Sequence, residues 1–155
     1  MRIEEKVAQS LINMKKTLAI AESCTGGLLA NRLTNIPGSS NFLKFALIAY
    51  SNEAKIKLLK VPQEAIRKYG AVSTQVAVSM AQKARKSLKT NFGIGITGIA
   101  GPTGGTKAKP IGLTFIAVCT EVETLCLKCH FQGSRKTVKT QAATQALRLL
   151  HEFLS

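Results

Sequence analysis

Apolar positions along the chain alternate between the period of a helix and the period of a strand. Ile3, Val7 and Leu11 recur at helical spacing, and the apolar run over 17–21 then predicts a short buried strand. A second amphipathic stretch over 28–33 follows a polar, glycine-containing turn and predicts another helix. The first part of the chain is therefore expected to form helix, strand and helix in succession.

The same alternation continues to the carboxyl end. Further strands are predicted over 45–50, 92–96, 112–120 and 124–131, and further helices over 52–59, from Pro62 to about Gly70, from Ser73 to about Leu88 and from Ser134 onwards. The last two strands are separated by 121–123 alone, which predicts a hairpin. Five strands and about five helices in this order predict an α/β sandwich with a parallel core and a mixed five-stranded sheet.

Length and composition predict a single domain over residues 1–155. A chain of 155 residues with 45% hydrophobic side chains can bury roughly 70% of the surface of its unfolded state. No apolar run reaches the roughly 18 residues that a membrane span requires, and residues 1–16 lack the apolar core of a signal peptide. We therefore expect a cytoplasmic protein without a membrane partner.

The charge is strongly basic, and the types of charged residue exclude several mechanisms. All 8 acids are glutamates, so a Ser-His-Asp triad, an EF-hand loop and a kinase-type catalytic aspartate are excluded. Two histidines and four cysteines, expected to be free thiols, do not suggest a metal site, and no cofactor is expected. The net charge of +14 suits an anionic ligand, but 5% aromatic residues without tryptophan offer no base-stacking platform, so no specific nucleic-acid partner is expected.

Candidate chemistry gathers where three of the predicted strands end. Polar or glycine-rich segments over 22–27, 50–55 and 97–105 follow these strands, and ligands bind at the carboxyl ends of strands in open α/β sheets. The segment 93–98 formally matches G-x-G-x-x-G, but its glycines lie within a strand and a proline-containing loop follows in place of a helix. A dinucleotide-binding fingerprint is therefore rejected.

A serine activated by a lysine is the chemistry that these residue types allow. Tyr50 and Lys55 are close enough in sequence to face one pocket together with a loop serine, Ser39 or Ser40. Without a histidine–aspartate pair, a serine nucleophile needs a lysine as its base. That lysine must be partly removed from water so that its pKa falls.

Several sequence blocks together resemble one known family. They are Ala21–Gly27, Pro37–Ser40, Tyr50–Lys55, Gly70–Ser73, Thr97–Pro102, Gly104–Gly105 and Lys109–Gly112. In this order, and spread over residues 17–154, they resemble the carboxy-terminal domain of the competence/damage-inducible CinA family. The resemblance implies a three-layer α/β/α sandwich with a mixed, mostly parallel five-stranded sheet, in a homodimer. It also implies a nicotinamide-nucleotide amidohydrolase, which converts nicotinamide mononucleotide and water to nicotinate mononucleotide and ammonia.

The resemblance also implies roles for individual residues. Ser40 is expected to be the nucleophile, Lys55 the base that activates it, and Tyr50 a hydroxyl that supports the proton transfer. The substrate-binding residues that it implies are Ser23, Thr25, Gly26, Gly27, Thr97, Gly98, Gly101 and Arg135. Among these, the main-chain N–H groups of the glycine-rich turns are expected to hold the oxyanion or the phosphate, and Arg135 to meet the anionic substrate.

Three alternatives remain open at this point. Ser23 also lies in a loop at a strand end, so it competes with Ser40 for the role of nucleophile. Cys24 is a weaker candidate, because no histidine is near it in sequence. The alternative of another class is a catalytically lapsed domain that binds a nucleotide or nucleic acid.

Overall fold

Six α-helices and five strands alternate along the chain, in the order that the apolar pattern predicts. The computed structural model describes residues 1–155. Its elements are α1 (Ile3–Met14), β1 (Leu18–Glu22), α2 (Leu28–Thr34), the single 3-10 turn η1 (Ser39–Asn41), β2 (Leu43–Ile48), α3 (Asn52–Lys57), α4 (Gln63–Tyr69), α5 (Thr74–Ser87), β3 (Phe92–Gly98), β4 (Leu113–Cys119), β5 (Thr124–His130) and α6 (Arg135–Leu154). All five predicted strands are present.

The strands form one mixed sheet in the order β2-β1-β3-β4-β5. β1 pairs in parallel with β2 and with β3, whereas β4 is antiparallel to both β3 and β5. Every strand except β4 therefore runs in the same direction, which confirms the mostly parallel sheet and the late hairpin. β2 begins and ends two residues earlier than predicted, because Leu43 is already in register with Leu18 of β1, whereas the apolar run continues past Ile48, the last residue in register.

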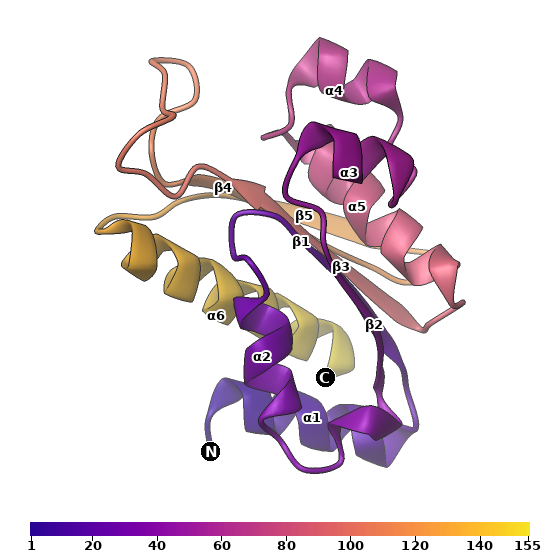
Figure 1. The fold of residues 1–155 in the computed structure, drawn as a ribbon. Helices are drawn as coiled ribbons and strands as arrows, with labels where there is room; N and C mark the ends of the chain where they lie inside the picture. Colours follow the sequence, from indigo (N-terminus) through magenta and orange to yellow (C-terminus); the bar gives the residue numbers. More distant parts are fainter.

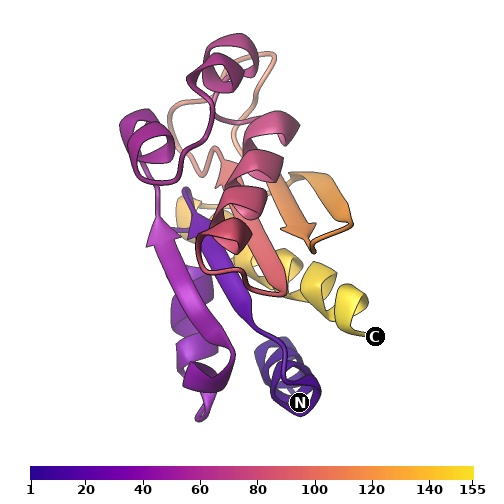
Figure 2. The same ribbon diagram turned by 90° about the vertical axis from the view of Figure 1, so that its right-hand side faces the viewer.

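Helices cover both faces of the sheet. α1, α2 and α6 lie on one face and α3, α4 and α5 on the other (Figure 1), and the view turned by 90° shows the sheet between them (Figure 2). Side chains of α1, α2 and α6 contribute to a core cluster of 21 buried residues, and α5 packs over two smaller clusters on the opposite face. The three-layer α/β/α sandwich is thus confirmed. None of the helices combines the length and the apolar character needed to cross a membrane.

Glycines in β3 allow α5 to approach the sheet closely. A Cβ atom at Gly95 would lie 2.6 Å from the main-chain nitrogen of Ala81 and would also overlap the carbonyl oxygen of Ala77, both in α5. Gly93 faces the same helix in the same way, against the carbonyl oxygen of Ala81. The Gly-x-Gly pattern in β3 therefore serves helix–sheet packing, which agrees with the rejection of a dinucleotide fingerprint.

Gly95→Ala is expected to lower the free energy of unfolding by about 3 kcal/mol, because the added methyl group must displace helix backbone and not a flexible side chain. Urea unfolding followed by circular dichroism measures this change. Ile94→Val, in the same strand but pointing into the other core cluster, is the control and should cost about 1 kcal/mol. A stability of Gly95→Ala within about 0.5 kcal/mol of the wild type would contradict the close packing of α5 on β3.

Candidate functional site

Parallel pairing brings the carboxyl ends of β1, β2 and β3 to one edge of the sheet. Glu22, at the end of β1, is in register with Ile48 of β2 and with Ile96 of β3. The residues that follow these strands therefore lie side by side. A pocket of about 270 Å³ opens there, and 15 residues line it: Ser23, Cys24, Tyr50, Asn52, Lys55, Ala71, Val72, Thr97, Gly98, Ile99, Ala100, Gly101, Thr103, Gly104 and Arg135.

A buried lysine and serine are in contact at the base of this pocket. Lys55 Nζ lies 3.0 Å from Ser23 Oγ and 3.0 Å from the carbonyl oxygen of Tyr50. Lys55 is 2% exposed and Ser23 is 7% exposed. The side chain of Ser51 caps α3 by accepting a hydrogen bond from Ala54 N at 3.0 Å, and this cap fixes the first turn of the helix that carries Lys55.

Burial shifts the protonation of Lys55 towards the neutral amine. No carboxylate forms an ion pair with it, and both of its hydrogen-bond partners are uncharged oxygens. Removal from water therefore lowers the pKa of Lys55 below its ordinary value, and this effect exceeds the opposing influence of Cys24. A lysine with a lowered pKa in contact with a hydroxyl has the chemical properties of a general base.

Cys24, which follows Ser23, is not activated as a nucleophile. Burial raises the pKa of its thiol to about 11, so the group stays protonated near neutral pH. The other three cysteines also have a raised pKa, and all four are free thiols, as expected.

The amino end of α2 is capped by Glu22 and is not open to a ligand. The carboxylate of Glu22 accepts hydrogen bonds from Leu29 N and Ala30 N, each at 3.0 Å, and so satisfies the first turn of α2. Gly26 N donates to the carbonyl oxygen of Ser23 at 3.0 Å. The amino end of α2 is thus already occupied by a carboxylate of the chain itself.

This arrangement places three of the eight expected substrate-binding residues outside the pocket. Thr25, Gly26 and Gly27 do not line the pocket, and Thr25 is completely buried. Ser23, Thr97, Gly98, Gly101 and Arg135 do line it, as the sequence predicts. The difference arises because Thr25, Gly26 and Gly27 form the turn into α2, whereas Ser23 precedes that turn.

Arg135 joins two sides of the pocket at its rim. Its guanidinium group donates to the carbonyl oxygen of Gly101 at 2.7 Å and to the hydroxyl of Tyr50 at 3.1 Å. Tyr50 therefore contacts Lys55 through its main-chain carbonyl oxygen, while its hydroxyl group lies at the rim of the pocket and contacts Arg135. The hydroxyl of Thr97, in turn, donates to the carbonyl oxygen of Ala71 at 2.9 Å and ties β3 to the loop before α5.

Ser40 lies at the opposite end of β2 from this pocket. It belongs to η1, which precedes β2, and it is exposed. The six residues of β2 separate it from the Tyr50 end by about 20 Å. The expected pocket containing Ser40 and Lys55 is therefore not formed, and Ser23 occupies the place beside the lysine.

The pocket is also lined by Asn52, Thr103 and Gly104, which were not among the expected site residues. Asn52 follows the cap of α3, and the other two lie in the glycine-rich loop after β3. All three lie in the segments 50–55 and 97–105, which the sequence marks as polar ends of strands. The sequence therefore indicated these segments, but it did not distinguish these three residues within them.

Fold and site together define an α/β/α-sandwich domain with a lysine-paired serine at the carboxyl edge of its sheet. The family model described as the CinA C-terminal domain matches residues 1–154. The chain belongs to this family. It is 45% identical over 152 residues to a "Putative competence-damage inducible protein" of Clostridium novyi, with 98% of this chain covered. It is 48% identical over 154 residues to a "CinA-like protein" of Syntrophus aciditrophicus, with 99% of this chain covered.

Solved structures of the family share the whole architecture. The competence/damage inducible protein CihA from Agrobacterium tumefaciens superposes with a TM-score of 0.95 at 34% sequence identity, covering 99% of this chain and 96% of that one. A CinA superfamily protein from Escherichia coli gives a TM-score of 0.91 at 34% identity, covering 97% and 90%. The chain spans 37% of the length of the two curated relatives above.

Proposed function

We propose that this domain hydrolyses the carboxamide of nicotinamide mononucleotide to nicotinate mononucleotide and ammonia, with Ser23 as nucleophile and Lys55 as general base. The contact of 3.0 Å between Lys55 Nζ and Ser23 Oγ carries the proposal. Membership of the CinA C-terminal domain family and the resemblance described above support the choice of substrate. A carboxamide is a poor acyl donor, so its hydrolysis needs an activated nucleophile of this kind.

The reaction follows from the protonation state of the pair. Neutral Lys55 takes the proton of the Ser23 hydroxyl while Oγ attacks the carboxamide carbon, and the carbonyl oxygen becomes an oxyanion. The tetrahedral intermediate collapses to an acyl-serine, and the proton held by Lys55 leaves with the nitrogen as ammonia. Water, deprotonated by the same amine, then attacks the acyl group, releases the carboxylate product and restores Ser23.

Donors for the two negative charges lie around the serine. The main-chain N–H group of Cys24 donates to no oxygen of the protein, and Cys24 follows the nucleophile directly and lines the pocket, so we assign this N–H group to the oxyanion. Arg135 lies at the rim and presents a guanidinium group, which suits the 5′-phosphate of the nucleotide.

Ammonia release from nicotinamide mononucleotide by the purified domain tests the proposed function. The domain is expected to release one ammonia per nicotinate mononucleotide formed, in the presence of EDTA. Nicotinamide riboside, which lacks the phosphate, is the matched substrate control and should react with a higher KM. Absence of turnover combined with saturable binding of the nucleotide would favour the lapsed binding domain and overturn the amidase.

A further inference from the structure

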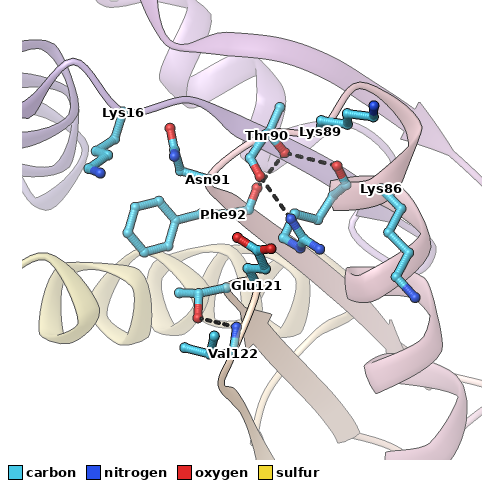
Figure 3. Close-up of a pocket in the computed structure, with 10 residues that line it drawn as sticks. Lys16, Lys86, Lys89, Thr90, Asn91, Phe92, Glu121 and Val122 are labelled. Carbon is cyan, nitrogen blue, oxygen red and sulfur yellow. Dashed lines mark hydrogen bonds between the residues drawn. The ribbon is translucent and has the colours of Figure 1, made fainter.

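A second and larger cavity lies at the other end of the sheet. It measures about 710 Å³ and is formed by the carboxyl end of α5, the starts of β1 and β3, and the turn between β4 and β5 (Figure 3). The seven residues of β3 place it about 23 Å from the Ser23 pocket. A ligand in this cavity therefore does not touch the proposed catalytic residues.

Four cationic side chains line this cavity, and one carboxylate accompanies them. The cations are Lys16, Arg85, Lys86 and Lys89, and the carboxylate is Glu121. None of the four cations forms an ion pair, because the ion pairs of the protein involve Arg2, Arg32, Lys57 and Arg67. Figure 3 shows Lys16 on the opposite side of the cavity from Lys86 and Lys89. Unneutralised positive charge thus surrounds a concave surface.

The backbone around these cations is held in a fixed arrangement. Asn91 Oδ1 accepts hydrogen bonds from the main-chain N–H of Thr17 at 2.9 Å and from its hydroxyl at 3.1 Å, and Asn91 N donates back to Thr17 Oγ1 at 3.1 Å. This clamp joins the segment that carries Lys16 to the start of β3. Across the cavity, Arg85 donates to the carbonyl oxygen of Thr90 at 3.3 Å, which ties the end of α5 to the same strand.

The ends of the two neighbouring helices do not account for this charge. α1 and α5 both end at the cavity, and each carboxyl end contributes about −0.5 elementary charge. Together with Glu121, these helix ends offset about two of the four positive charges. About two positive charges remain without any negative partner in the protein.

We propose that this cavity binds a small molecule that carries two or more adjacent phosphate groups, such as a nucleoside triphosphate or inorganic triphosphate. Adjacent phosphate groups carry several closely spaced negative charges, and these neutralise the positive charge that remains in the cavity. A nucleic acid fits less well, because the cavity has no exposed aromatic side chain on which a base could stack. The one aromatic side chain in the cavity, Phe92, is 7% exposed and offers no stacking surface.

Isothermal titration calorimetry of the whole chain with inorganic triphosphate and with ATP, in about 0.15 M NaCl, tests the site. The double variant Lys86→Gln/Lys89→Gln is expected to bind either ligand about tenfold or more weakly than the wild type. The control is Lys6→Gln/Lys128→Gln, which removes the same charge from exposed positions in α1 and β5, outside the cavity, and should bind as the wild type does. Thermal unfolding verifies that both variants are folded.

Two results would overturn the proposal. Equal weakening in both double variants would show that binding follows the overall charge of +14 and not the cavity. A lack of binding of both polyphosphates, or tighter binding of a DNA duplex that depends on Lys86 and Lys89, would exclude a small polyphosphate as the ligand. Because binding is read directly, these outcomes are independent of the amidase activity.

Discussion

Replacing Ser23 by alanine is expected to lower the rate of ammonia release from nicotinamide mononucleotide by about 10⁴-fold or more, because the acyl-serine can no longer form. The hydroxyl lies 3.0 Å from the amine of Lys55, and removal of one oxygen leaves the surrounding backbone unchanged. Steady-state kinetics with quantified ammonia measures the loss.

Ser40→Ala is the matched control for this experiment. Ser40 is exposed in η1 and lies far from the pocket, so its hydroxyl has no part in the proposed reaction. The variant should keep the activity of the wild type. Full activity in Ser23→Ala, or a large loss in Ser40→Ala, would contradict the assignment of the nucleophile.

Lys55→Met is expected to reduce turnover by about 10³-fold or more, because general acid–base catalysis by a positioned side chain contributes about that much. Methionine keeps much of the volume of the lysine and carries no charge. Since Lys55 is buried without a carboxylate partner, its replacement should leave the domain folded and equally or more stable. A variant that unfolds, or one that keeps its activity, would contradict the account of Lys55.

The pH dependence of the wild type provides a second readout for Lys55. The base must be neutral, so kcat/KM should rise with pH through the pKa of Lys55, and burial places this rise below the ordinary range of a lysine near 10.5. Because the pKa is lower in the folded than in the unfolded state, the stability cost of Lys55 is present at low pH and disappears as pH rises. Lys55→Met should therefore gain most in stability at low pH and gain least above the unfolded pKa.

The sequence predicts the fold well because the same pattern of apolar runs and polar turns repeats along the chain. Each strand is a short apolar run bounded by polar turns, and a serine precedes three of the helices and caps each one by accepting a main-chain hydrogen bond: Ser51, Ser73 and Ser134. The boundary of β2 was less accurate, since apolar residues continue past the point where pairing stops. Glu22 shows what a local pattern does not reveal, because its carboxylate caps a helix that begins six residues later.

The sequence located the sheet edge that carries the pocket, but the structure does not place Ser40, the expected nucleophile, beside Lys55. The segments after β1, β2 and β3 meet because parallel strands end at one edge, and this placed Lys55 in the pocket correctly. Ser40 was assigned beside Lys55, although it precedes β2 while Lys55 follows it. A serine before a parallel strand and a lysine after it lie at opposite ends of the sheet, whereas Ser23 follows β1 and reaches the same edge as the lysine.

Identification of the acylated residue tests the central claim most directly. The domain is mixed with nicotinamide mononucleotide, quenched in acid and digested with trypsin, which places Ser23 in the peptide 17–32 and Ser40 in the peptide 33–44. Mass spectrometry is expected to find the acyl adduct on the peptide 17–32, with fragmentation assigning it to Ser23, and to find none in Ser23→Ala. An adduct on the peptide 33–44 would contradict the claim that the serine beside Lys55 is the nucleophile.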